Sequence, residues 1–304
     1  MDKIFFLAFT IIVLVPKPVY LEKADWIIDK PVKLVSQNIA VNTNIKVVKG
    51  GELILVNSTL YFNNERKEGY VLEVFPGGKL TIISSTITGP KDRYYSIFVH
   101  YNASLTIVNS TIRNAGWKDQ AETSEYKYIG PAYTRDYSIG GHGLEINTTV
   151  KEFKGNLFEN IASIRFYSSN NVVENNTVTG IRHEGLAFMR SSNNNIVRNN
   201  IIVNASTMKR ETYAIRFYPG TRNQQVYNNT IKRVEAGIMV SLIPPWSPGT
   251  NFTIHDNEMR DVTFGFTGKL KDSRVTTRGT SIRSPQSTLR RPATLSSRIQ
   301  RYRM

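Results

Sequence analysis

The stretch GGELILVNSTLYFN (residues 50–63) is followed by two close copies, GGKLTIISSTITG (77–89) and NASLTIVNSTIRN (102–114). Leu53, Leu80 and Leu105 occupy the same place in each copy and lie 27 and 25 residues apart. Later stretches keep the pattern with other letters: VVENNTV (172–178), IVRNNII (196–202), QVYNNTI (225–231) and TIHDNEM (253–259). Repeats of this length, built from short strands without helical periodicity, predict a β-helix.

Alternation within each copy explains why the chain would coil. Leu53, Leu55 and Leu60 alternate with polar or outward positions, so one side of each strand is buried and the other faces water. Successive coils then stack as parallel strands about 4.8 Å apart, with equivalent residues above one another. The recurring asparagines Asn176, Asn200, Asn229 and Asn257 are therefore predicted to form a ladder that stabilises the corners.

The NN-T/I and G-h-x-h patterns between Val41 and Gly268 resemble those of the right-handed parallel β-helix superfamily, in particular its NosD-like, carbohydrate-binding and sugar-hydrolase (pectate-lyase-like) branch. The resemblance implies an all-β fold, a right-handed parallel β-helix of about nine to ten coils. The superfamily includes pectate lyases, polygalacturonases, uronan epimerases, a copper-accessory periplasmic protein and surface proteins without a known reaction, so the fold leaves the activity open.

Composition divides the chain into three parts: a hydrophobic segment at residues 1–24, the β-helix at 25–268 and a basic tail at 269–304. Ile4–Val15 is apolar except for Thr10 and follows Lys3, which favours a signal peptide over a buried first strand. We therefore expect export, with the protein extracellular or on the cell surface. Potential glycosylation sequons fit this expectation and begin at Asn57, Asn102, Asn109, Asn147, Asn175, Asn204, Asn228 and Asn251.

The formal net charge is +15, and the tail holds ten Lys or Arg but one acid, Asp272. Such a composition favours disorder. The tail is interpreted as a basic arm for an anionic surface, a passive end, or the product of a frame shift that cut a longer β-helix short. No specific nucleic-acid partner is predicted, and a membrane is expected to be contacted only through an uncleaved N-terminal segment. The oligomeric state is left open.

The composition excludes several chemistries. The chain has no cysteine, so disulfides and thiol catalysis are excluded. Asp136, Asp256 and Asp261 are scattered and do not form the carboxylate pair of a glycoside hydrolase. Glu145 is expected to be the only carboxylate on the candidate face, which disfavours a calcium site. No metal or other cofactor is predicted.

Insertions into a solenoid form loops on its flanks, where sites are common. The longest insertion spans 114–142 and carries Trp117, and another at 241–249 carries Trp246. Shorter connections at 179–184 and 204–213 are expected at the same edge as the longest one. Aromatic loops should therefore border one strand face.

Alignment of the apolar strands GLEI, SIRF, GLAF, AIRF and GIMV predicts what that face carries. The outward third position gives Glu145, Arg165, Ala187, Arg216 and Met239, and the next outward position gives Asn147, Tyr167, Met189, Tyr218 and Ser241. Arginine binds carboxylates and aromatic faces stack on sugars. We expect a groove for an acidic polysaccharide or cell-envelope glycan, formed by Trp117, Glu145, Arg165, Tyr167, Arg216, Tyr218 and Trp246. The alternative is a plain surface with an exposed Glu145–Arg165 ion pair.

An enzyme is the second hypothesis. His142, His183 and Glu184 are the candidate acid/base residues of a polysaccharide lyase, hydrolase or epimerase, with Arg165 and Tyr167 nearby. The further alternatives are a copper-accessory protein and a purely structural surface protein. Copper is disfavoured because His142 and His183 would lie two coils apart.

Overall fold

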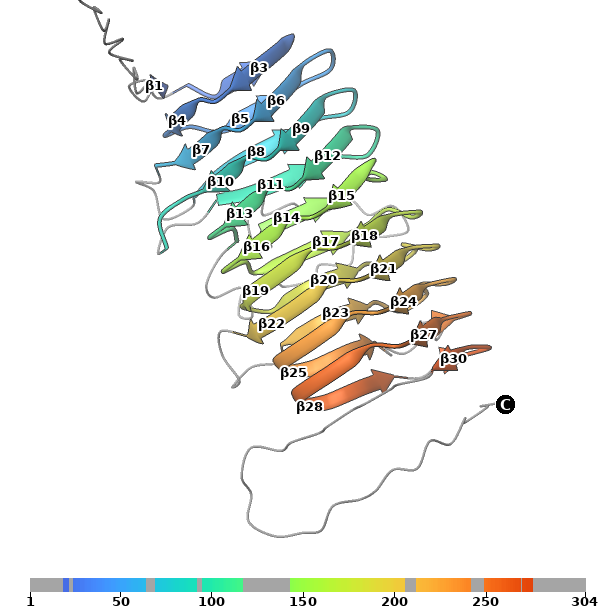
Figure 1. Ribbon diagram of the computed structural model, residues 1–304. Helices are drawn as coiled ribbons and strands as arrows, with labels where there is room; N and C mark the ends of the chain where they lie inside the picture. Colours follow the sequence, from blue (N-terminus) through green and yellow to red (C-terminus); the bar gives the residue numbers. More distant parts are fainter. Residues whose placement is uncertain are drawn as a thin grey trace, which may run out of the picture.

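The computed structural model describes residues 19–21, 24–63, 69–91, 95–116, 143–205, 212–241, 249–268 and 270–275. These residues form a parallel β-helix in which each coil lies directly on the previous one (Figure 1). Every strand pairing between coils is parallel, and the described residues include no helix. None of them forms a helix long and apolar enough to span a membrane. The predicted fold class is confirmed.

The strands fall into three stacks that run along the axis (Figure 1). The first stack is a ten-stranded sheet with the order β3 (Pro31–Val35), β6 (Glu52–Val56), β9 (Lys79–Ile83), β12 (Ser104–Val108), β15 (Glu152–Lys154), β18 (Val172–Glu174), β21 (Ile196–Arg198), β24 (Gln225–Tyr227), β27 (Thr253–His255) and β30 (Arg274–Val275).

The second and third stacks join into one sheet because the long strands β25 (Thr230–Val240) and β28 (Glu258–Gly268) run through both. The rest of the second stack is β1 (Val19–Leu21), β4 (Asn38–Val41), β7 (Thr59–Phe62), β10 (Thr86–Thr88), β13 (Thr111–Arg113), β16 (Leu157–Glu159), β19 (Thr177–Ile181) and β22 (Ile201–Ala205).

The third stack carries the candidate site. Its remaining strands are β2 (Trp26–Ile28), β5 (Ile45–Val47), β8 (Tyr70–Val74), β11 (Tyr95–Val99), β14 (Gly143–Ile146), β17 (Ser163–Phe166), β20 (Glu184–Phe188) and β23 (Tyr213–Phe217). A short separate pair is formed by β26 (Gly249–Thr250) and β29 (Leu270–Lys271).

Strand pairing extends beyond the expected limits of the β-helix at both ends. β1 lies before residue 25, and β29 and β30 lie within the segment expected to be a tail. The coil therefore continues past Gly268, because Thr253 and Ile254 of β27 pair with Arg274 and Val275. The apolar run at 4–15, predicted to be a signal-peptide core, and the expected tail from 276 onward lie outside the described residues.

The interior is filled by residues from all three stacks. Leucine, isoleucine and valine dominate throughout, and the later coils add a set of buried phenylalanines. Phe166, Phe188 and Phe217 stack in register with 5.0 Å between the centroids of successive rings. Equivalent positions in successive coils thus carry the same side chain, so each coil packs on the next with a matched shape.

The predicted asparagine ladder exists and is longer than expected. The Oδ1 of Asn200 accepts hydrogen bonds from the backbone N and the Nδ2 of Asn176, at 3.0 and 3.1 Å, while its Nδ2 donates to the carbonyl of Val173 at 2.9 Å. The same contacts recur from Asn156 to Asn257. Serines Ser58, Ser85 and Ser110 continue the ladder through the earlier coils.

The residue before each ladder position adopts a left-handed backbone. Its φ is 56° at Asn175 and Asn199 and 55° at Asn228. Asparagine tolerates this conformation better than most residues with a side chain. The Asn-Asn pairs of the sequence are therefore explained by two different demands: the first residue turns the chain and the second bonds to the next coil.

Substitution of Asn200 by alanine should lower the free energy of unfolding by roughly 2–4 kcal/mol, because buried groups of Asn176 and Val173 lose their partners. Urea denaturation followed by circular dichroism measures the change. Asn194→Gly is the matched control: Asn194 is exposed, lies in a parallel outer row and has a φ of 56° that glycine accepts. An equal loss in both variants would contradict the role of the buried ladder.

Candidate functional site

The outward side of the third stack carries one continuous row of residues in register. Strand pairing places Glu145 beside Arg165, Arg165 beside Ala187, and Ala187 beside Arg216. The row continues to Met239 at one end and through Phe98, Glu73 and Lys46 at the other. The predicted alignment of these strands is therefore correct.

The expected exposure of this row is wrong. Arg165 is 2% exposed, and Glu145, Met189 and Tyr218 are also buried. Ala187, Met189 and Tyr218 form a small apolar cluster with Tyr167 on the outside of the sheet. Because large side chains in register lie over one another, the face resembles a second, polar core rather than a row of solvated side chains.

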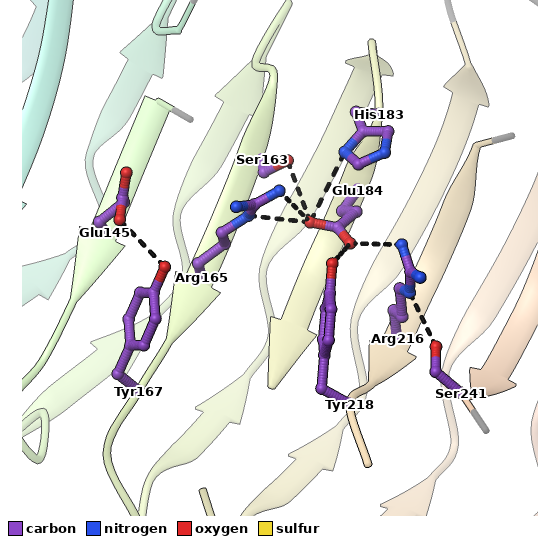
Figure 2. A network of polar contacts seen from close by, with 9 residues as sticks. All are labelled: Glu145, Ser163, Arg165, Tyr167, His183, Glu184, Arg216, Tyr218 and Ser241. Carbon is purple, nitrogen blue, oxygen red and sulfur yellow. Dashed lines mark hydrogen bonds and ion pairs between the residues drawn. The ribbon is translucent and has the colours of Figure 1, made fainter. Parts of the chain in front are cut away.

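Glu184 is the centre of this face (Figure 2). Its Oε2 accepts hydrogen bonds from Nε of Arg165 and pairs with Nη2 of the same residue, both at 2.9 Å. Its Oε1 accepts from Nη1 of Arg216 at 3.0 Å and from the hydroxyl of Tyr218 at 2.7 Å. One fully buried carboxylate thus binds two arginines and a tyrosine.

A β-bulge places Glu184 on this face. Ser163 pairs with Glu184, but the next residue, Ile164, pairs with Leu186, so Gly185 is the extra residue of β20. A Cβ atom at Gly185 would lie 2.5 Å from the carbonyl oxygen of Ala214, so no larger residue fits. The sequence predicted Glu145 as the only carboxylate here. That prediction is wrong, because alternation of strand residues does not reveal the bulge.

The ion pairs fix the charge of Glu184. Burial by itself would raise the pKa of its carboxyl, but Arg165, His183 and Arg216, with the Tyr218 hydroxyl, lower it from 4.5 to about 2. Burial would likewise lower the pKa of Arg165, and the Glu184 carboxylate raises it instead. Glu184 therefore remains ionised at ordinary pH and is not a proton donor.

Arg216 is held on both sides. Its guanidinium carbon lies 4.5 Å from the ring centroids of both Tyr213 and Tyr218, in cation–π geometry. Its Nε donates to Oγ of Ser241 at 2.9 Å. Arg216 is therefore fixed in one orientation, while 14% of its side chain stays accessible to solvent.

One donor of Arg165 is left over. Its Nη1 is buried and has no hydrogen-bond partner in the described part of the chain. Glu184 already accepts from the Nε side of the same guanidinium. An unsatisfied buried donor on a charged group is costly, and such atoms call for an acceptor.

The remaining predicted site residues are placed as follows. The Tyr167 hydroxyl donates to Oε2 of Glu145 at 3.1 Å, next to Arg165 (Figure 2). His183 is 37% exposed, and its Nδ1 lies 3.7 Å from Oε2 of Glu184. The other three residues lie outside the described residues: Trp117, His142 and Trp246. Within the described ranges no three His, Asp or Glu side chains gather as a metal-binding group.

Sequence reasoning missed two partners and one pair. Ser163 and Tyr213 contact the central groups, and Glu73 binds His100 at 2.7 Å on the same face. Ser241, which the strand alignment did place on this face, binds Arg216. VLEV and IFVH precede the longest insertion, and alignment of these strands with GLEI would have placed Glu73 and His100 on the face.

The comparison with protein-family models agrees with this fold. Residues 43–257 match the family model described as "Right handed beta helix region". A comparison with curated proteins finds no match. Among solved structures, the chain is similar to the periplasmic alginate epimerase AlgG at 11% identity and a TM-score of 0.46, with 79% of this chain and 59% of that chain covered. The chain thus spans about three fifths of that protein's length.

Acid should weaken the folded state through Glu184. The folded pKa of about 2 lies below the ordinary 4.5, so the stabilisation is present above pH 4.5 and is lost as the pH falls toward 2. The loss is about 3 kcal/mol. Glu184→Gln should already lack this stabilisation at pH 7, where an unpaired buried arginine costs about 3–5 kcal/mol.

Urea denaturation of both proteins at pH 7, 4.5 and 2.5 checks this prediction. The difference between the wild type and Glu184→Gln should narrow toward the lowest pH. Glu174→Gln is the control, since Glu174 is partly exposed on the first stack, where it pairs with Arg198. A difference that stays constant down to pH 2.5 would contradict the ionised state of Glu184.

Proposed function

The chain belongs to the right-handed β-helix family. We propose that it binds an acidic polysaccharide whose carboxylates form hydrogen bonds with Arg165 and Arg216. The binding surface is the outward side of the third stack from β14 to β25. The ligand class follows from the donors, because guanidinium groups bind carboxylates through paired hydrogen bonds. The tyrosines beside them suit the apolar faces of sugar rings.

The unpaired Nη1 of Arg165 is the observation that carries this proposal. Two nitrogens of this guanidinium are used by Glu184, and the third points to no acceptor among the described residues. A carboxylate oxygen of a ligand would complete the set of hydrogen bonds. Burial strengthens such a contact, since water competes less with the ligand.

The charge of the cluster supports the same ligand. Arg165 and Arg216 carry two positive charges, and Glu184 neutralises one of them. The two guanidinium groups are fixed before any ligand arrives, by Glu184, by the flanking tyrosines and by Ser241. Fixed donors lose little conformational entropy on binding, which favours affinity.

Binding is supported better than the proposed catalysis by His142, His183 and Glu184. An acid/base residue works best with a pKa near the working pH. The pKa of Glu184 is far below that range, because its carboxylate is occupied by two arginines. Glu184 is therefore a positioning residue for Arg165 and Arg216 in this proposal.

Isothermal titration with a panel of polymers tests the proposal. We expect polygalacturonate or polyglucuronate to bind and neutral dextran not to bind, with affinity falling as salt is added. Arg216→Gln should weaken binding at least tenfold, because a charge-assisted contact is lost. The fold should survive, since Arg165 still pairs with Glu184.

Arg113→Gln is the matched control. Arg113 is about half exposed on the second stack and pairs with Glu159, so its loss should leave affinity unchanged. Equal weakening in both variants would mean nonspecific attraction by a basic protein. If the folded wild type binds no carboxylated polymer, the proposal is wrong.

We also propose that the protein works outside the cytoplasm, as the apolar run at 4–15 suggests. Fractionation of an exporting host cell should place the full chain outside the cytoplasm. A variant without residues 2–24 should remain inside. A full chain found only in the cytoplasm would contradict export.

A further inference from the structure

A second polar group lies on the same face, toward the N-terminal coils. Strand pairing puts Phe98 between Glu73 and Glu145, and Glu145 lies one coil before Arg165. Both carboxylates are 8% exposed. The face is therefore acidic next to the arginines, although the chain as a whole is strongly basic.

Each of these carboxylates is fixed by a neighbour. Oε1 of Glu73 lies 2.7 Å from Nε2 of His100, whose ring stacks on Phe75 at 5.0 Å and meets Phe98 edge-on at 4.5 Å. Glu145 is bound by the Tyr167 hydroxyl. The aromatic rings and carboxylates form one surface that continues directly into the arginine cluster.

An unsatisfied hydroxyl lies on this surface. Ser96 precedes Phe98 on the same side of β11, because Ile97 between them points into the core. Ser96 is 6% exposed, and its Oγ has no hydrogen-bond partner in the described residues. Arg165 is similar, because its Nη1 also has no hydrogen-bond partner. The same face thus carries two buried polar atoms without partners in the described residues, and these atoms lie two coils apart.

We infer that the ligand is a copolymer of uronic acid and amino sugar, rather than a polymer of uronic acid alone. This inference rests on the proposed function. The uronate carboxylate lies on Arg165, and the neighbouring amino sugar lies over β11 and β14, toward Glu73. Its amide or ammonium hydrogens meet Glu145 and its other polar groups meet Ser96, while the next amino sugar, two units further along the polymer, meets Glu73.

The negative charges of Glu145 and Glu73 are the reason for proposing an amino sugar beside the uronate. One coil advances about 4.8 Å along the axis, which is comparable to one pyranose unit. In a polymer of uronic acid alone, the carboxylates of successive sugars would therefore lie against Glu145 and, two sugars further on, against Glu73, and like charges at this range repel in a poorly hydrated site. An N–H donor at the same place is attracted by the carboxylate. If the nitrogen is a protonated amine, its positive charge is also attracted by the faces of the neighbouring aromatic rings.

Titration with defined oligosaccharides of equal length tests the inference. Hyaluronan octasaccharide alternates glucuronate with N-acetylglucosamine, and oligogalacturonate carries a carboxylate on every sugar. At low ionic strength the wild type should bind the hyaluronan octasaccharide at least about tenfold more tightly, and added salt should reduce the preference.

Two glutamine variants test whether the carboxylates of Glu145 and Glu73 produce the preference for hyaluronan. Glu145→Gln and Glu73→Gln keep an acceptor for Tyr167 and His100 and remove the negative charge. Each should raise the affinity for oligogalacturonate about fivefold and change that for hyaluronan less than about twofold. Glu159→Gln on the second stack, paired with Arg113, should change neither.

Ser96→Ala is the second test, and it does not depend on the charged pairs. It removes a hydroxyl that has no partner, so the folded state should be unaffected. Hyaluronan affinity should fall about fivefold and oligogalacturonate affinity should not change.

The outcomes separate the two proposals. If oligogalacturonate binds as tightly as hyaluronan and the glutamine variants leave that ratio unchanged, the copolymer inference is wrong and acidic-polysaccharide binding stands. If neither oligosaccharide binds the folded wild type, the proposed function itself fails.

Discussion

The hydrogen bonds between coil corners are the constraint on which the rest of the structure depends. The side chain of Asn200, for example, accepts a hydrogen bond from the backbone N–H of Asn176 in the coil before it. It also donates a hydrogen bond to the backbone carbonyl of Val173 in that coil. Each coil is thereby locked in register with its neighbours. A slip of one residue would exchange the inward and outward sides of a strand. The lock therefore places phenylalanines above phenylalanines inside and arginines beside carboxylates outside.

The same register also brings Arg165, Glu184 and Arg216 together on the outward side of the third stack. Arg165 and Arg216 come from strands that are far apart in sequence, and Ala187 separates them in the row. The small side chain of Ala187 leaves space between the arginines, and Glu184, delivered by the bulge at Gly185, joins them. A buried carboxylate with two guanidinium groups is costly to desolvate and gains stability only through complete pairing. Pairing is incomplete here, because Nη1 of Arg165 has no partner among the described residues, and the proposed function assigns that donor to a ligand.

Much of this could be predicted from residue patterns. Asn176 to Asn257 were predicted as a ladder, and GLEI, SIRF, GLAF and AIRF were aligned in the register that the structure shows. Both depend on local alternation and repeat spacing, which a sequence displays directly. The burial of Arg165 and Tyr218 was not predicted, because exposure depends on what lies over a side chain. Glu184 was grouped with Arg165, but its place on the face and its contact with Arg216 were missed, because a bulge shifts residues without changing their periodicity.

The sequence by itself determined the β-helix, its repeat, the corner ladder and the identity of the residues in the outward row. These follow from period-two alternation and from asparagine at recurring places, which are properties of short segments. Only the tertiary structure decided that this row is buried and that Glu184 lies at its centre, with both arginines on its carboxylate. Those features depend on side chains brought together from different coils, and the energy of a charge depends on its surroundings rather than on its neighbours in sequence.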